Sequence, residues 1–381
     1  MSLVLNEDQR MLQQSARDFC REQAPVAVLR RIRDSKDPTG YPADLWRAMV
    51  ELGWAGMAIP EAYGGFGFGY SGLGLVLEET GRTLVPTPLV STVLLSATLI
   101  NLAGSEAQKL ETLPDIVAGE TVVALALEET AIHNPLHIEL KAVKTGSGYI
   151  LNGQKDFVLD AHVADQFIVV ARTEGETGHQ DGISLFLVDA SSVGVAVQKL
   201  SMVDSRNAGN VAFFDVEVPD DALLGEENRG WPALSRTLDI ARIGLSAEML
   251  GGVQEVFERT VEYLKQRSQF GVPIGAFQAL QHRAAIMYSE IELCKSLVLK
   301  ALHELDRGQE AEDIPALASM CKAKLSDVYM LVSNEGIQMH GGIGMTDEFD
   351  IGFYLKRARV AQQTLGDAAF HRDRYASLRG F

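Results

Sequence analysis

The sequence predicts a mainly α-helical protein with a β domain in its middle, which places it in the α+β class. Apolar residues repeat at helical spacing in both end regions, and short β-branched runs fill the region between them. With 381 residues, 46% of them apolar, the chain is long enough for two or three packed domains. Because the composition changes near Gly119 and Gly230, we expect domains at residues 1–118, 119–226 and 227–381.

The first region contains helical patterns separated by breaks rich in glycine and proline. The predicted helices are Gln9–Cys20, Pro42–Leu52, Leu73–Arg82, Pro88–Leu102 and Glu106–Val117. The most apolar stretch, Leu89–Leu102, is short and interrupted by serine, threonine and asparagine. We therefore expect no membrane segment.

The middle region contains seven short β-branched runs with turn residues between them. The predicted strands are Val122–Leu127, Ile138–Val143, Tyr149–Leu151, Phe167–Ala171, Ile183–Val188, Val195–Leu200 and Val211–Val218. Since no helical pattern separates them, they favour an antiparallel barrel or sandwich over a parallel sheet. The last region returns to longer helical patterns, including Ile314–Met339, which are typical of a helical bundle.

Charge and targeting patterns narrow the possible partners. The formal net charge of -17 argues against nucleic acid, which needs a basic surface. No N-terminal segment resembles a signal peptide, and the three cysteines are odd in number and widely spaced. We expect a cytoplasmic protein whose cysteines are buried.

Two short motifs are assigned structural roles. Residues 67–72 match the dinucleotide pattern G-x-G-x-x-G, but no β-branched strand precedes them, so a connecting loop is favoured. His133 and His137 have a spacing that suits a metal on a helix, yet Pro135 lies between them and no further cluster accompanies them. We predict no metal site.

Several motifs, in order along nearly the whole chain, resemble the acyl-CoA dehydrogenase family. They are Ile59–Gly65, Glu78–Arg82, Leu151–Lys155, Phe214–Pro219, Arg267–Gly271, Phe277–Gln278 and Gln338–Gly344. The resemblance implies an N-terminal helical domain, a middle β domain and a C-terminal four-helix bundle. It also implies a dimer or tetramer, an acyl-CoA substrate, and FAD bound between subunits. An electron-transfer flavoprotein is the acceptor that the family leads us to expect.

The resemblance implies that the C-terminal motifs contact the pyrophosphate and adenosine half of FAD. Arg267 offers a planar fork of donors to a diphosphate, and Gly341 and Gly342 let backbone N–H groups approach a ligand closely. The other residues expected to contact the cofactor are Gln269, Phe270, Phe277, Gln278, Gln338 and His340. Taken one at a time, a surface salt bridge for Arg267, a core position for Phe270 and a helix-ending turn for Gly341 and Gly342 are the better explanations. Taken together and in order, these residues favour cofactor contact.

The reaction implied by the family removes a proton from the α-carbon of an acyl-CoA, which requires a carboxylate base. Most members place a glutamate just before a Gly-Thr pair, where this chain has Leu365. Others place it on the helix before the arginine motif, where this chain has Ala241. Two nearby acids could substitute, Asp367 and Asp239, with a surface carboxylate or a helix cap as the alternative role for each. Asp239 is expected to point about 200° away from Ala241 around its helix.

The motif that faces the flavin also differs from the family. Leu127-Glu128-Glu129 stands where members have Thr-Glu-Pro, and Leu159 stands where they have a hydroxyl residue. Phe157 is expected to keep the aromatic contact with the flavin. In this respect the chain resembles bacterial members that work as heteromers, in which one subunit carries the base and the other completes the cofactor pocket.

Two functions therefore stay open. The chain could take part in FAD-dependent dehydrogenation of an acyl-CoA, alone with an unusual base or as one subunit of a heteromer. Alternatively, it is a non-catalytic structural partner that completes the FAD pocket of a related dehydrogenase.

Overall fold

The computed structural model describes residues 4–308 and 313–381 and divides the chain into two compact units. Unit 1 contains Met1–Arg31, Tyr70–Val85 and Arg242–Phe381, and unit 2 contains Ile32–Gly69 and Pro86–Ala241. Both units therefore combine distant parts of the sequence, and the predicted domain boundaries stay a prediction. None of the helices in the described ranges has the length and apolarity to cross a bilayer.

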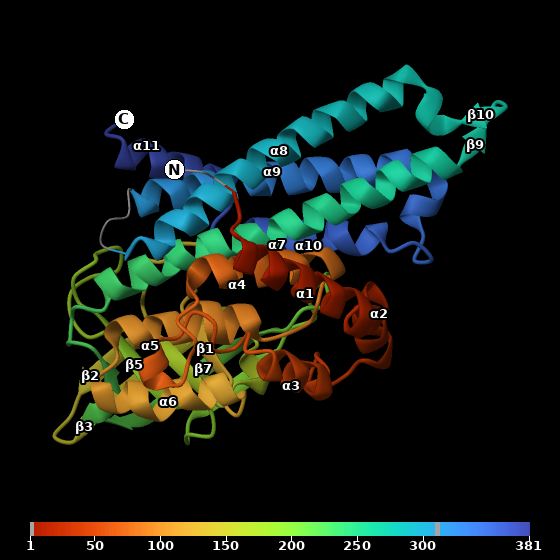
Figure 1. Cartoon of the computed structure of the whole chain (residues 1–381). Coiled ribbons are helices and arrows are strands. Elements are labelled where there is room, and N and C mark those ends of the chain that lie inside the picture. Colours follow the sequence, from red (N-terminus) through yellow and green to blue (C-terminus); the bar gives the residue numbers. More distant parts are fainter. Residues whose placement is uncertain (1–3, 309–312) are drawn as a thin grey trace. The chain divides into compact units, whose positions relative to one another are not determined.

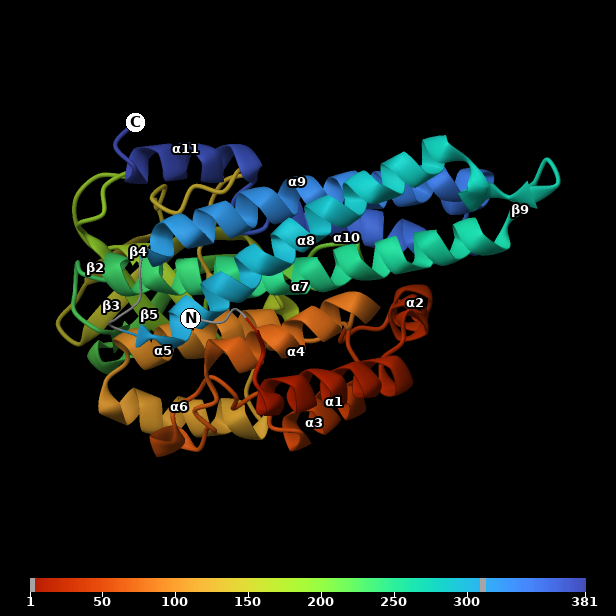
Figure 2. The ribbon, with the colours of Figure 1, turned by 45° about the horizontal axis from the view of Figure 1, so that its top comes forward.

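Unit 1 is a bundle of helices. Its members are α1 (Glu7–Gln23), α4 (Gly69–Thr83), most of α7 (Trp231–Gln266), α8 (Gln278–Asp306), α9 (Ile314–His340), α10 (Ile351–Gln363) and α11 (Ala368–Leu378). Helix α9 packs against α8, α10 and α11 (Figures 1 and 2). The long C-terminal helices predicted from the apolar spacing are confirmed.

Glycines let α4 and α7 approach closely within unit 1. A Cβ added at Gly81 would lie 1.9 Å from the carbonyl oxygen of Glu248, and one added at Gly251 would lie 1.7 Å from that of Glu78. Both distances are far shorter than any van der Waals contact, so alanine at either position would force the two helix backbones apart.

Unit 2 contains one eight-stranded sheet in the order β6-β7-β3-β2-β4-β5-β8, with β1 paired to β4. Its strands are β1 (Val123–Ala126), β2 (Lys141–Lys144), β3 (Gly148–Leu159), β4 (Gln166–Arg172), β5 (Ile183–Asp189), β6 (Val195–Lys199), β7 (Ala208–Pro219) and β8 (Leu223–Leu224). The seven predicted strands are confirmed, with β8 added. Most pairs are antiparallel, but β1–β4 and β2–β4 are parallel, so the sheet is mixed.

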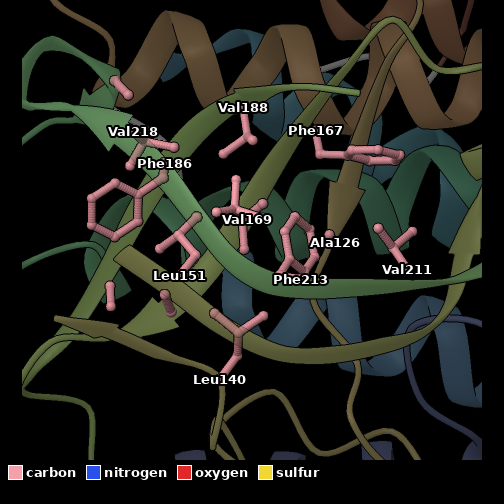
Figure 3. Close-up of a cluster of buried hydrophobic side chains, with 14 of the residues drawn as sticks. Ala126, Leu140, Leu151, Phe167, Val169, Phe186, Val188, Val211, Phe213 and Val218 are labelled. Atoms are coloured by element: carbon pink, nitrogen blue, oxygen red, sulfur yellow. The ribbon is translucent and has the colours of Figure 1, made fainter. Parts of the chain in front are cut away.

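The core of unit 2 lies against this sheet. Figure 3 shows Leu151, Val169 and Phe186, from three strands, within one cluster of buried side chains. The rings of Phe167 and Phe213 meet edge to face in the same cluster, with centroids 6.4 Å apart. These inward positions alternate with more exposed ones along β3 and β7, the pattern expected of a half-buried strand.

The helices of unit 2 are shorter. They are α2 (Val26–Ser35, beginning in unit 1), α3 (Ala43–Glu51), α5 (Thr98–Ala103) and α6 (Glu106–Ala118). The predicted helix Pro88–Leu102 divides into a π-helical segment, η2 (Leu89–Ala97), followed by α5. The hydroxyls of Thr92 and Ser96 both donate to the carbonyl oxygen of Val123 in β1, at 3.2 and 2.8 Å. The remaining 3₁₀ turns are η1 (Glu61–Tyr63), η3 (Ala161–Val163), η4 (Asp220–Ala222), η5 (Ile274–Ala276) and η7 (Gly341–Met345).

Candidate cofactor surface and active-site turn

An exposed hairpin in unit 1 carries the first group of predicted cofactor residues. Strands β9 (Ser268–Gln269) and β10 (Val272–Pro273) pair between α7 and α8 (Figure 1). Phe270 is at its tip in the left-handed conformation, with φ of 55°, and 90% of its surface is exposed. Its ring meets that of Phe277 edge to face, with centroids 6.1 Å apart. An apolar ring this exposed is available to a planar ligand.

The polar residues beside this hairpin are exposed as well. Arg267 follows the end of α7, Gln269 lies in β9, and Gln278 begins α8. The Arg267 N–H donates to the carbonyl of Tyr263, which continues the helical hydrogen bonding and leaves the guanidinium outside the bundle core. Donors of this kind, next to exposed aromatic rings, suit a ligand with a diphosphate and a flat base.

The glycine pair at the end of α9 is open. Gly341 has φ of 64°, and a Cβ built on Gly341 or Gly342 would meet nothing within 4 Å. The Gly341 N–H donates to the carbonyl oxygen of Gln338, and the space beside both glycines is open, so a ligand can lie against this backbone. Gln338, one turn earlier, is exposed.

His340 has different surroundings from its neighbours. It is 3% exposed, its Nδ1 lies 2.7 Å from the carbonyl oxygen of Gly336, and its ring stacks on that of Tyr263 at 4.4 Å. Burial is the main cause that lowers the pKa of His340, so the ring is neutral near pH 7. These contacts describe a packing role within the bundle, and cofactor contact by His340 stays a prediction.

The turn between α10 and α11 places Leu365 where the family pattern leads us to expect a base. Leu365 has φ of 60° and is 8% exposed. Its carbonyl oxygen accepts hydrogen bonds from Arg242 Nε at 3.2 Å and from His371 Nε2 at 3.0 Å. Among the backbone hydrogen bonds of residues 4–308 and 313–381, none is donated by the Leu365 N–H. The turn has no proton acceptor of its own at this position, but it keeps an available amide donor.

The two substitute acids have structural surroundings that differ from each other. Asp367 is the N-cap of α11, where its carboxylate accepts the N–H of Phe370 at 2.8 Å. Asp367 therefore has the helix-cap role that we considered as its alternative. Asp239 is 2% exposed, so it is not the surface carboxylate that we considered as its alternative role. Ala241 is fully buried, and α7 is buried on every side from Thr237 to Val253, which is why rotation around this helix does not separate an inner from an outer face.

In unit 2, the segment predicted to face the flavin uses its polar groups internally. Lys155 is fully buried, and its Nζ donates to the carbonyl oxygen of Leu127 at 3.1 Å and to Glu129 Oε1 at 2.5 Å. The Glu129 carboxylate also accepts the N–H of Leu140 at 3.1 Å, while Glu128 pairs with His133. Burial lowers the pKa of Lys155, opposed by the carboxylate of Glu129. Lys155 and Glu129 therefore bond to each other and to the nearby backbone, and their polar groups are not left for a ligand.

Phe157 lies at an irregularity of β3 beside this pair. Its φ is 51°, 48% of its surface is exposed, and its N–H donates to Asn210 Oδ1 at 3.2 Å. The left-handed conformation turns this residue out of the regular strand alternation. Leu159, two residues further, offers no hydroxyl.

Sequence reasoning missed two buried lysines near these positions. Lys155 lies within a predicted motif, but nothing in the motif indicated its partner Glu129, which precedes it by 26 residues. Lys322 on α9 is fully buried, and it donates to carbonyl oxygens of the Leu365 turn. A lysine inside an apolar helical pattern is the signal that could have indicated a buried charge.

Family comparison covers nearly the whole chain in three consecutive matches. Residues 6–120 match the N-terminal domain of acyl-CoA dehydrogenases, residues 126–216 match the middle domain and residues 228–377 match the C-terminal domain.

Individual relatives are similar over most of their length. Isovaleryl-CoA dehydrogenase of Pongo abelii is 32% identical, with 97% of this chain and 88% of that protein covered. The caffeyl-CoA reductase-Etf complex subunit CarC of Acetobacterium woodii is 29% identical, with 94% of each chain covered. The solved structure of a variant of the steroid ACAD Tcur3481-Tcur3483 is 32% identical, with a TM-score of 0.87 over 98% of each chain. The chain therefore belongs to the acyl-CoA dehydrogenase family.

Proposed function

We propose that this chain takes part in the FAD-dependent α,β-dehydrogenation of an acyl-CoA thioester, as one subunit of a heteromer. The observation that carries the proposal is the Leu365 turn, which lacks a carboxylate while the nearest acid, Asp367, caps a helix. A proton cannot be taken from the α-carbon by a leucine, so another subunit supplies the base.

FAD is the cofactor that the residues of unit 1 fit. The Arg267 guanidinium would hold the diphosphate, and the amides of Gln269 and Gln278 with the ring of Phe270 would hold the adenosine half. The open backbone at Gly341 and Gly342 would let the cofactor lie against it. When bound, FAD supplies the acceptor for the hydride that leaves the β-carbon of the acyl group.

On the acyl side, this chain contributes an amide. The N–H of Leu365 is available to donate to the thioester carbonyl, which would polarise the α C–H bond. An electron-transfer flavoprotein would then reoxidise the flavin, as the relative that is a subunit of a reductase-Etf complex suggests.

A second function is favoured by the buried pair of Lys155 and Glu129, which bind each other inside unit 2 and are therefore not offered to a ligand. In this alternative the chain is a structural partner that completes the FAD pocket of a related dehydrogenase and binds no acyl-CoA itself. Replacing Leu365 by glycine distinguishes the two functions, since glycine adopts positive φ without restraint and loosens the turn. A raised KM of the heteromer for acyl-CoA supports participation, and an unchanged KM supports the structural partner.

The experiment that tests the proposal records a visible spectrum of two samples. One is the chain purified alone, and the other is the chain co-expressed with a dehydrogenase subunit encoded by a neighbouring gene. We expect little flavin in the first sample, and in the second a flavin spectrum that acyl-CoA bleaches without oxygen. Stoichiometric flavin that bleaches in the chain alone would show an autonomous enzyme and contradict the heteromer.

A further inference from the structure

The turn that carries Leu365 has a strained backbone. A leucine at φ of 60° is disfavoured relative to the right-handed region, because its Cβ comes close to the following carbonyl oxygen. Such a conformation persists where surrounding contacts determine it. The contacts that hold this turn are therefore part of how the chain positions the Leu365 N–H.

The first contacts are on the Leu365 carbonyl. Arg242 Nε on α7 lies 3.2 Å from it, and His371 Nε2 on α11 lies 3.0 Å from it. The guanidinium of Arg242 also lies over the ring of Phe370, with its central carbon 5.6 Å from the ring centroid. These side chains fix the direction of one peptide plane, but the planes on either side need their own partners.

Lys322 supplies those partners. Its Nζ donates to the carbonyl oxygen of Gln362 at 3.0 Å, to that of Gly366 at 2.7 Å and to Ser326 Oγ at 3.3 Å. An ammonium group has three N–H donors, and these contacts occupy all of them. One fully buried side chain thus connects the last turn of α10 to the residue that follows Leu365.

The surroundings of Lys322 oppose its charge. Burial, together with the charges of Arg242 on α7 and Arg357 on α10, lowers the pKa of Lys322 from 10.5 to about 7, while Asp367 at the start of α11 opposes this shift. On α11, His371 also faces this turn. On α8, Glu290 pairs with Lys324, two residues along α9 from Lys322. The ammonium is therefore close to losing its proton near neutral pH.

We propose that Lys322 is a positioning residue whose protonated ammonium holds the Leu365 turn in its left-handed conformation and releases it when the proton is lost. The role of the turn in binding an acyl thioester rests on the proposed function, but the hold itself does not. The neutral amine has one donor fewer and no charge, so the carbonyls of Gln362 and Gly366 are held less strongly.

Global stability should change in the opposite direction. Because the pKa of Lys322 is lower in the folded chain than in the unfolded chain, the unfolded chain binds more protons between pH 7 and pH 10.5. The contribution of Lys322 to the free energy of unfolding therefore rises with pH across that window. Looser packing of the turn at higher pH is therefore a local effect in which Lys322 stays buried and only its hydrogen bonds weaken. An opening that exposed the amine to water would raise its pKa and would be favoured at low pH instead.

Hydrogen exchange of the full chain, measured by mass spectrometry on peptides that cover residues 360–368, tests the proposal. After correction for intrinsic rates, we expect exchange in this segment to rise about tenfold from about pH 6 to about pH 8.5. Lys322→Met should exchange rapidly at both pH values. Lys324→Met removes the same charge two residues away and should behave like the unchanged chain.

A final variant tests whether the pH dependence comes from Lys322 or from the nearby imidazole of His371. His371→Gln keeps an N–H donor but cannot titrate, so the pH dependence should survive in it. Exchange that is flat with pH in the unchanged chain, or a pH dependence lost in His371→Gln, would overturn the proposal. Since the unchanged chain alone gives the first result, the proposal stays testable if Lys322→Met does not fold, and no turnover is needed.

Discussion

The exposed surface of unit 1 and the predicted flavin-facing segment of unit 2 use their polar residues in opposite ways. In unit 1, Arg267 and Phe270 extend from the hairpin region, and Gly341 leaves its backbone open. In unit 2, Lys155 and Glu129 bind each other and the nearby backbone. Exposed groups are available to a ligand, while groups that are buried and paired internally stabilise the chain. The comparison indicates that this chain keeps one half of a cofactor site.

The largest effect is expected from substitutions that break the buried pair of Lys155 and Glu129 in unit 2. Lys155→Met or Glu129→Gln alone should lower the free energy of unfolding by about 3–5 kcal/mol, because each leaves a buried group without its partner. The double variant should recover much of this loss. Urea unfolding measures all three, and additive losses would contradict a coupled pair. Lys295→Met, at a solvent-accessible pair with Glu292, is the control and should leave unfolding unchanged.

The next effect concerns the surface of unit 1. Arg267→Ala in the co-purified heteromer should raise the dissociation constant for FAD about 10- to 100-fold, because a charge-assisted contact to a diphosphate is lost. Unfolding should not change, since the side chain is exposed. Arg229→Ala removes another exposed arginine, 78% accessible, and serves as the control in a fluorescence titration with FAD. Equal affinities in the two variants would leave Arg267 as a surface residue.

Substitutions of Asp367 test whether this residue is a helix cap or the catalytic base. Asp367→Ala should lower the free energy of unfolding by about 1 kcal/mol, while Asp367→Asn should change it little because asparagine caps helices as well as aspartate. Turnover of the heteromer should also survive in Asp367→Asn. An inactive but stable asparagine variant would identify Asp367 as the base and contradict the heteromer proposal.

The smallest effect is at the hairpin tip. Phe270→Ala should weaken FAD binding about 2- to 10-fold, the value of one aromatic contact, without lowering stability, because 90% of the residue is exposed. The same titration measures it. A lower unfolding midpoint would show instead that Phe270 packs within the chain through Phe277.

Much of the fold could be predicted from the sequence because the periodicity is strong. The seven β-branched runs all form strands, since alternation and turn residues act locally. The two-residue strand β8 is too short to leave a pattern, and α2 offers few turns of apolar spacing. In the π-helical segment η2, Ser96 bonds to Val123, 27 residues away, and no local pattern shows this contact.

The residues of the candidate site that face a ligand could be predicted from the sequence. The buried residues that hold those positions in place could not. Arg267 and Phe270 lie in a motif whose residues are adjacent in sequence, so resemblance was enough to locate them. Lys322 acts through carbonyls 40 and 44 residues later in the chain. Such contacts come from helix packing, and a lone lysine in a helical pattern does not reveal them.

The ratio of flavin to polypeptide in the purified heteromer tests the central claim most directly, because it counts complete cofactor sites. If this chain supplies one half of a site and its partner the other, the heteromer should hold half as many flavins as chains. Arg267→Ala in this chain should then lower that occupancy at limiting FAD. As many flavins as chains, with occupancy insensitive to Arg267, would contradict the account.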